Sequence, residues 1–130
     1  MAIFRIDGAP KTRAVNQVAH GFAVADAIRN SGAGWVKAQA DSVSNAGHGW
    51  ETGLVSAVAD VDNFTVRFDG PVTSAAHGFT SGKELFLDPS TAGDLTETEP
   101  SASGQVSRVF ATVVDGNTLN VGVKTGIEIP

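Results

Sequence analysis

The sequence predicts an all-β protein that consists of two repeated small β-barrel or β-sandwich units. Three observations predict this class: apolar residues alternate with polar ones in short runs, turn-forming residues are frequent, and two motifs recur along the chain. Gly contributes 15 and Pro 5 of the 130 residues, which is typical of many short strands joined by tight turns. The hydrophobic fraction of 42% is high enough for a packed core.

The internal repeat defines the expected units. The tetrapeptide Ala-His-Gly-Phe occurs at 19–22 and again at 76–79, and the segment 58–66 resembles the segment 113–121. The two matches keep the same order at nearly the same spacing, which favours duplication of one unit over chance. We therefore expect an N-terminal arm over 1–17, a first β-unit over 18–70 and a second β-unit over 71–130.

Each unit contains strand patterns. In residues 64–68 the apolar side chains alternate with polar ones and would share one face of a strand, and residues 119–123 repeat this pattern. Residues 84–87 form a short apolar run that ends at Asp88-Pro89, where a turn is favoured. Alanines at 22–30 would suit a helical turn, but the matching segment of the second unit contains Gly and β-forming residues. The repeat therefore favours a turn followed by a strand at both places.

Residues 108–114 are predicted to form another strand, which turns at Asp115-Gly116-Asn117 into the next one. An Asp-Gly pair supplies the positive φ that a tight hairpin needs. Residues 60–63 should make the equivalent turn in the first unit. Their two aspartates and one asparagine resemble the start of a calcium loop, but the glycine and glutamate that complete such a loop are missing.

Charge and composition exclude several classes of protein. The net charge is −5, with nine basic residues scattered along an acidic chain, so we expect no nucleic-acid partner. There is no cysteine and therefore no disulfide or thiolate metal site. The first residues lack the apolar region of a signal peptide, and no apolar run approaches the roughly 20 residues of a membrane span. We expect synthesis in the cytoplasm and no membrane contact.

The basic residues of the N-terminal arm are the first candidates for a contact surface. Arg5, Lys11 and Arg13 stand against a single acidic residue, Asp7. The hypothesis is that these three cations make an assembly contact with an acidic neighbouring surface. A merely solvated tail is the alternative.

The histidines do not form a recognisable metal motif. His20, His48 and His77 each precede a glycine, and two of them occupy the same place in the repeat, so a structural role in turns is favoured. Metal binding would need ligands that converge at defined spacing. A site formed by symmetry-related histidines on an oligomer axis is the alternative. We therefore expect no metal and no cofactor.

No catalytic motif is present in the sequence. There is no nucleophile elbow and no phosphate-binding loop, and Glu97 and Glu99 lie in a segment with the composition of a solvated loop. We therefore expect a protein that is not an enzyme. Trp35 and Trp50 flank a stretch rich in small residues and are candidates for stacking on sugars, although burial in a core or subunit contact is the commoner role of such residues.

One stretch of the second unit carries a family resemblance. It comprises Gly78-Phe79, the run Leu85-Phe86-Leu87-Asp88-Pro89-Ser90-Thr91-Ala92-Gly93-Asp94-Leu95-Thr96, and Thr98-Glu99-Pro100 followed by 104–107 and Val109. This pattern resembles a module of bacteriophage virion proteins, chiefly fibres and related surface proteins. Residues 78–123 are covered well, and 19–68 is similar to a looser first copy. Family members tend to carry Ser at the position of Asp88.

The resemblance implies a β-rich unit that forms homotrimers, has no catalytic residues and resides in the virion after synthesis in the host cytoplasm. Since such modules usually belong to longer chains, a chain that ends at Pro130 favours a capsid decoration protein or a head spike or fibre-base protein. Its expected partners are the major capsid protein or another virion protein. The alternative is a tail fibre or adhesin module that binds host-surface carbohydrate. A hydrolase would require a polar cleft with perturbed carboxylates.

Overall fold

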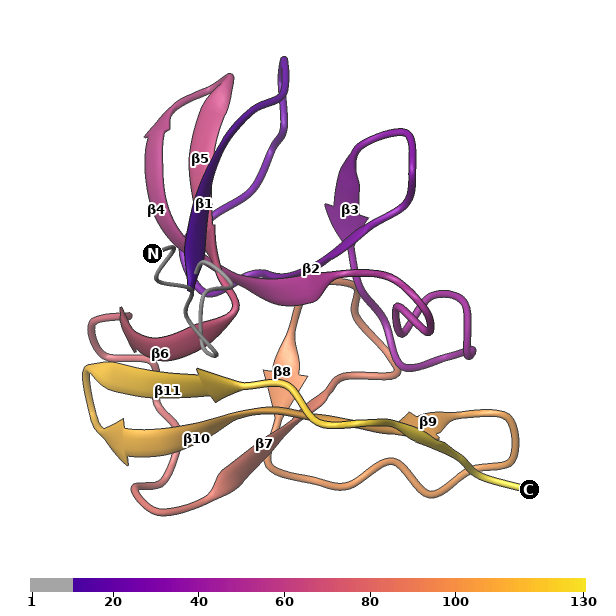
Figure 1. The fold of residues 1–130 in the computed structure, drawn as a ribbon. Coiled ribbons are helices and arrows are strands. Elements are labelled where there is room, and N and C mark those ends of the chain that lie inside the picture. Colours follow the sequence, from indigo (N-terminus) through magenta and orange to yellow (C-terminus); the bar gives the residue numbers. More distant parts are fainter. Residues whose placement is uncertain (1–10) are drawn as a thin grey trace, which may run out of the picture.

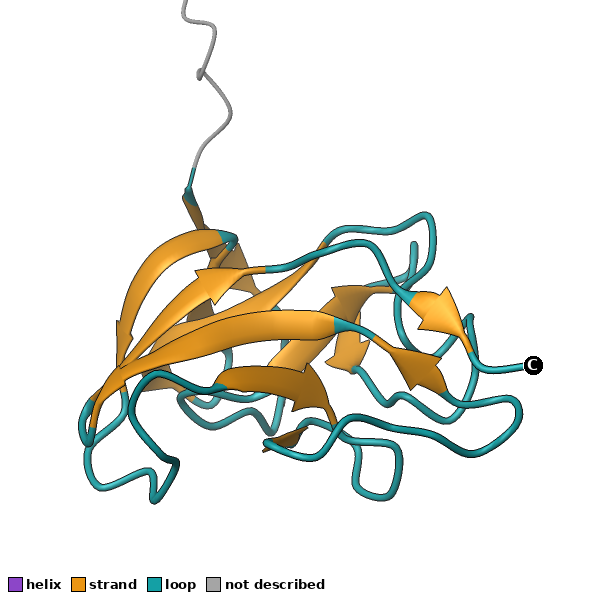
Figure 2. Ribbon diagram, turned by 90° about the horizontal axis from the view of Figure 1, so that it is seen from below, coloured by secondary structure: helices purple, strands orange, loops and turns teal. Residues whose placement is uncertain are grey.

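The computed structural model describes residues 11–130 and confirms the all-β prediction: this part of the chain contains strands, turns and loops but no helix (Figures 1 and 2). The strands are short and antiparallel, and they form two five-stranded sheets and one two-stranded ribbon. Turns with positive-φ glycines connect many of them, as the high glycine content predicts.

The first sheet contains the strands before residue 68. Its order is β1-β5-β4-β2-β3. The bounds are β1 Thr12–Asn16, β2 Ala27–Asn30, β3 Trp35–Lys37, β4 Thr52–Asp60 and β5 Asn63–Arg67. In β5 the buried Phe64 and Val66 alternate with half-buried polar residues, which confirms the face predicted from the sequence.

The second sheet follows after a single residue. Its order is β6-β11-β10-β7-β8. The bounds are β6 Asp69–Thr73, β7 Glu84–Leu87, β8 Leu95–Thr96, β10 Val109–Asp115 and β11 Thr118–Gly122. The ribbon pairs β9, Val106–Ser107, with β12, Ile127–Glu128. In β11 Leu119 and Val121 are buried, and the segment 84–87 is a strand as predicted.

The two sheets share one arrangement of strands. In the two strand orders, β1, β2 and β3 occupy the same places as β6, β7 and β8. The last two strands of each sheet along the chain form a hairpin, and these hairpins also occupy equivalent places. The hairpins are β4–β5 and β10–β11, and each contains a register shift just before its turn. This correspondence supports the interpretation of a duplicated unit that the sequence motifs suggest.

One hydrophobic core joins both halves of the chain. It contains Ala27, Ala38 and Leu54 from the first half together with many buried side chains of the second sheet. The members from the second half are Val72, Leu85, Leu87, Leu95, Val106, Phe110, Ala111, Val113, Leu119 and Val121. A second, smaller core lies within the first half and contains Phe22, Ile28, Trp35, Val55, Phe64 and Val66.

The boundaries of the units differ from those expected. Residues 12–16, which we placed in the N-terminal arm, form β1 and pair with β5 along its whole length. Residues 69–73, which we placed across the junction, form β6 and pair with β11. Both strands are held by hydrogen bonds to partners about 50 residues away in sequence, and a local pattern does not reveal such pairing.

The hairpin turn at Gly116 also differs in detail. Gly116 does not have the positive φ expected of an Asp-Gly pair. Instead, the Asp115 carboxylate accepts a hydrogen bond from the Asn117 N–H at 2.9 Å, and the register shift in β10 precedes the turn. The side-chain acceptor and the bulge together give the chain reversal that we had assigned to glycine.

Candidate functional site

Equivalent histidine loops close the ends of the two sheets. His20 Nε2 donates to the Asp60 carbonyl at 2.8 Å, and its Nδ1 accepts from the Phe22 N–H at 2.9 Å. His77 repeats both bonds with Asp115 and Phe79 at 2.6 and 3.0 Å. This pattern requires the neutral ring with its proton on Nε2. The two loops therefore use histidine as a structural clamp between loop and hairpin.

The hairpin turns beside these loops are capped by carboxylates. The Asp60 carboxylate accepts a hydrogen bond from the Asp62 N–H, and this bond is the main cause that lowers the pKa of Asp60. The pKa of Asp115 is lowered in the same way by the Asn117 N–H. Both carboxylates thus serve the turn and stay ionised. Within residues 11–130, no three His, Asp or Glu side chains converge to hold a metal ion.

The first sheet projects beyond the second through its hairpin (Figure 1). Leu54 of β4 pairs with Ala27 at the start of β2, and six residues then lead to the turn at Asp60. In the second sheet the corresponding pair is Thr112 with Glu84, and only three residues lead to Asp115. The hairpin of the first sheet is therefore longer by three residues on β4 and by two on β5, since β4 contains an additional bulge, and it extends roughly 7 Å further.

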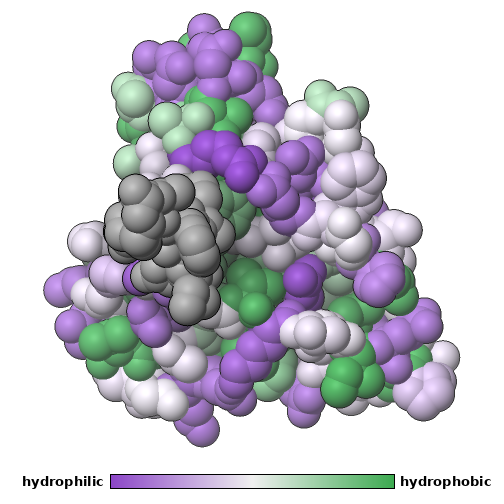
Figure 3. All heavy atoms as spheres, viewed as in Figure 1, coloured by the Kyte–Doolittle hydropathy of each residue, from purple (hydrophilic) through white to green (hydrophobic). Residues whose placement is uncertain are grey.

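The projecting end of the first sheet carries exposed apolar side chains. We call this surface the apolar end; it comprises the exposed Val18, Ala19, Val58 and Val61 around the His20 loop, and the core residue Phe22 lines the same hollow. The exposed fractions of Val18 and Val61 are 77% and 73%. Val58 is 38% exposed, whereas Val113, which takes its place beside the turn of the second sheet, is 3% exposed. Hydrophobic atoms are visible on the projecting lobe in Figure 3. A clustered apolar surface of this kind makes this end the candidate contact site of the described residues.

The predicted basic contact is only partly described by the structure. Arg5 lies outside the described residues. Lys11 is exposed and lies 3.9 Å from Asp69. Arg13 makes a two-pronged ion pair with Glu51 at 2.8 and 2.7 Å, which raises the pKa of Arg13 and lowers that of Glu51. Arg13 therefore already has an anionic partner in the same chain, and a role of the three cations in assembly stays a prediction.

The two tryptophans have different environments. Trp35 is 6% exposed in the smaller core, and the Gln17 side-chain amide binds both its N–H and its carbonyl at 2.7 and 2.9 Å. Trp35 is therefore unavailable for stacking on a sugar, which corrects that part of the sequence prediction. Trp35 is the first residue of β3 and points into the core, and a strand of three residues is too short for its sequence pattern to show which side chains point inward. Trp50 is 52% exposed and lies against Gly32.

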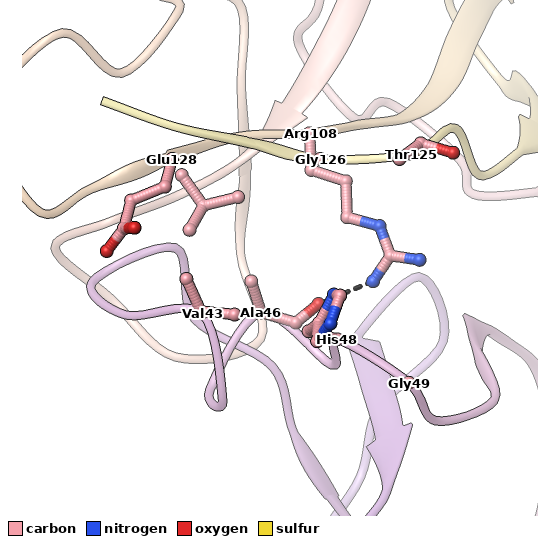
Figure 4. Close-up of a pocket in the computed structure, with 9 residues that line it drawn as sticks. Val43, Ala46, His48, Gly49, Arg108, Thr125, Gly126 and Glu128 are labelled. Atoms are coloured by element: carbon pink, nitrogen blue, oxygen red, sulfur yellow. Dashed lines mark hydrogen bonds between the residues drawn. The ribbon is translucent and has the colours of Figure 1, made fainter. Parts of the chain in front are cut away.

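A pocket of about 210 Å³ lies between the 43–49 turn and the C-terminal segment (Figure 4). Val43, Ala46 and Val106 give it apolar walls, and Arg108 provides its cation. Arg108 donates through Nη1 to the Ala46 carbonyl at 2.6 Å and through Nε to the Lys124 carbonyl at 2.8 Å. Burial lowers the pKa of Arg108. These bonds tie the C-terminal segment to the first half of the chain, and sequence reasoning did not single out this residue.

The comparisons with known proteins add no family to these observations. No protein-family model matches the sequence, and no curated protein or solved structure shows significant similarity to it. No helix within residues 11–130 is long and apolar enough to cross a membrane. The apolar end is thus the surface from which a function can be argued, and a comparison of the two repeats would have revealed it, because Val18 and Val61 stand where the second unit has Ala75 and Gly116.

Proposed function

We propose that this chain is a structural, non-enzymatic protein of a bacteriophage particle, which associates with copies of itself and with the particle surface. The expected class is a capsid decoration protein or a head spike or fibre-base protein. Two observations support this proposal: the resemblance of residues 78–123 to a module of virion proteins, and an all-β body that exposes a clustered apolar surface.

The apolar end is the observation that carries the proposal. Val61 lies in the turn of the projecting β4–β5 hairpin, Val18 lies in the loop that follows β1, and both side chains are mostly exposed. Covering exposed apolar side chains is favourable by about 25 cal/mol for each Å² removed from water. Such residues on an extended hairpin are explained by a partner that covers them.

The first partner in this proposal is a second copy of the chain, in a homotrimer. The second partner is the major capsid protein or another virion protein. Light scattering from purified protein over a wide concentration range tests the first part, and a protein that stays monomeric throughout would contradict it. Quantitative mass spectrometry of particles from the encoding phage tests the second: hundreds of copies per particle indicate decoration, a handful indicate a tail or vertex position, and absence refutes the proposal.

The exposure of Trp50 favours a second candidate function, the binding of host-surface carbohydrate by a tail fibre or adhesin module. An exposed indole offers a flat apolar face on which a sugar ring can stack. A glycan array with the wild-type protein and the Trp50→Ala variant tests this function. Binding that disappears in the variant supports it, and an array without any signal refutes it. Trp35 is not a suitable control, because its replacement would disturb the core.

A further inference from the structure

The His77 loop of the second half corresponds to the His20 loop beside the apolar end, and it has a neighbouring segment from the first half of the same chain. In the second half, His77, Phe79 and Leu119 line one pocket together with residues 24–26 of the first half. Ala25 and Phe79 both pack against the large core. The histidine loop of the second unit is therefore next to the 24–26 turn, which leads from the other histidine loop into β2.

The His77 loop and the 24–26 turn each have a counterpart in the other half of the chain, and these two counterparts do not lie next to each other. The His20 loop corresponds to the His77 loop; its Phe22 is buried in the smaller core, but the valines around it, Val18, Val58 and Val61, are exposed. Residues 81–83 correspond to residues 24–26, since each segment leads into the second strand of its sheet, and all three are exposed. A single chain thus presents one unfilled histidine loop and one unused turn.

The apolar surface beside the His20 loop is larger than that beside the His77 loop, as a contact with a further partner would require. At the uncovered loop the first unit has Val18 and Val61, where the second unit has Ala75 and Gly116. All four positions are exposed in the single chain. The second unit has one exposed valine of its own beside its turn, Val114, where the first unit has Ala59. The larger apolar surface of the first unit adds nothing to the packing of the chain itself, and an additional partner would account for it.

The charges differ in compensating directions as well. Asp62 Oδ1 accepts a hydrogen bond from the Ala19 N–H at 2.8 Å, and the neutral Asn117 makes the same bond to Ala76 at 3.0 Å. The fold thus needs the oxygen but not the negative charge. On the turns, Asp26 is replaced by Lys83. Asp26 lies 3.8 Å from Lys37, whereas no carboxylate lies within 4 Å of Lys83 among the described residues.

We propose that residues 81–83 of one copy dock on the apolar end of a second copy, with Lys83 beside Asp62 and the exposed valines covered. This inference rests on the proposed self-association and names its surfaces. The contact joins two different patches, so each copy uses one patch on either side. Contacts of this kind close into rings when the rotation between copies permits, and a homotrimer would then present six units in sequence.

A charge exchange tests the docking. Val61→Lys places a cation beside Lys83 of the neighbouring copy, and we expect the dissociation constant of the oligomer to rise about tenfold or more. Val61→Lys combined with Lys83→Glu restores the attraction, and we expect association to recover. Ile127→Lys is the matched control, because Ile127 is equally exposed, lies in β12 and belongs to neither patch. Sedimentation velocity over a concentration series measures each dissociation constant.

Disulfide trapping provides a second measurement that does not depend on affinity. The chain has no cysteine, so the double variant Val61→Cys with Lys83→Cys should form covalent oligomers under mild oxidation, whereas each single variant should not. Efficient cross-linking of either single variant would overturn the inference, because it would indicate contact between identical patches. An oligomer that neither Val61→Lys nor the cysteine pair affects refutes these surfaces alone. A wild-type protein that never associates refutes the proposed function with them.

Discussion

The paired histidine loops offer a comparison in which one substitution is made twice in the same molecule. His77→Ala removes two hydrogen bonds, to the Asp115 carbonyl and from the Phe79 N–H. At about 1 kcal/mol each, with water replacing part of them in a half-exposed loop, the expected loss of unfolding free energy is about 1–2 kcal/mol. His20→Ala removes the same two bonds and also an edge-on contact with Phe64 at 5.0 Å. That contact adds about 0.5–1 kcal/mol.

Urea denaturation at one fixed protein concentration measures these losses, with the fluorescence of the buried Trp35 as the signal. We expect the free energy of unfolding to be lowest for His20→Ala, higher for His77→Ala and highest for the wild type. His48→Ala is the control, since the His48 ring is exposed and makes no hydrogen bond to the described residues; we expect a change of less than about 0.5 kcal/mol. Loop variants as stable as this control, or a His77 variant less stable than the His20 variant, would refute the clamp.

Three further substitutions test the cores and the ion pair. Phe110→Ala, in the middle of the large core, should cost about 3–5 kcal/mol of unfolding free energy in urea denaturation. Gly53→Ala would place a Cβ 2.5 Å from the Arg67 carbonyl oxygen, and we expect a cost of about 2–3 kcal/mol by the same assay. Because Arg13 lowers the pKa of Glu51, the pair stabilises the fold above the ordinary carboxyl pKa, and this stabilisation is lost as pH falls. Glu51→Gln should therefore cost about 0.5–1 kcal/mol at neutral pH and almost nothing once the pH has fallen below the lowered pKa of Glu51. A difference from wild type that does not change with pH would contradict this.

Short sequence patterns correctly located several strands and the two histidine loops, because these elements depend on residues that are close together in sequence. Alternation located β5 and β11, and a short apolar run located β7. The two motifs at 19–22 and 76–79 identified loops that the structure closes with the same hydrogen bonds. The turn at Gly116 was assigned to the wrong cause, because a carboxylate acceptor and a positive-φ glycine both reverse a strand and sequence does not distinguish them.

Contacts between distant residues could not be predicted in this way. Arg13 and Glu51 are 38 residues apart, and only the pairing of β1 with β5 and of β5 with β4 brings their ends of the sheet together. The inward direction of Trp35 depends on how a three-residue strand is placed on its neighbour β2. The apolar end required a comparison of corresponding positions in the repeat, because Val18 and Val61 alone resemble ordinary surface residues.

The shared core has a consequence for how such a chain can evolve. Only Phe68 separates β5 from β6, and Ala27 and Leu54 of the first half are sealed by side chains from the second. Because this core is shared, neither half can be deleted or exchanged alone without uncovering the interior of the other. Substitutions on the outer surface are not constrained in this way, so the two halves can change there independently.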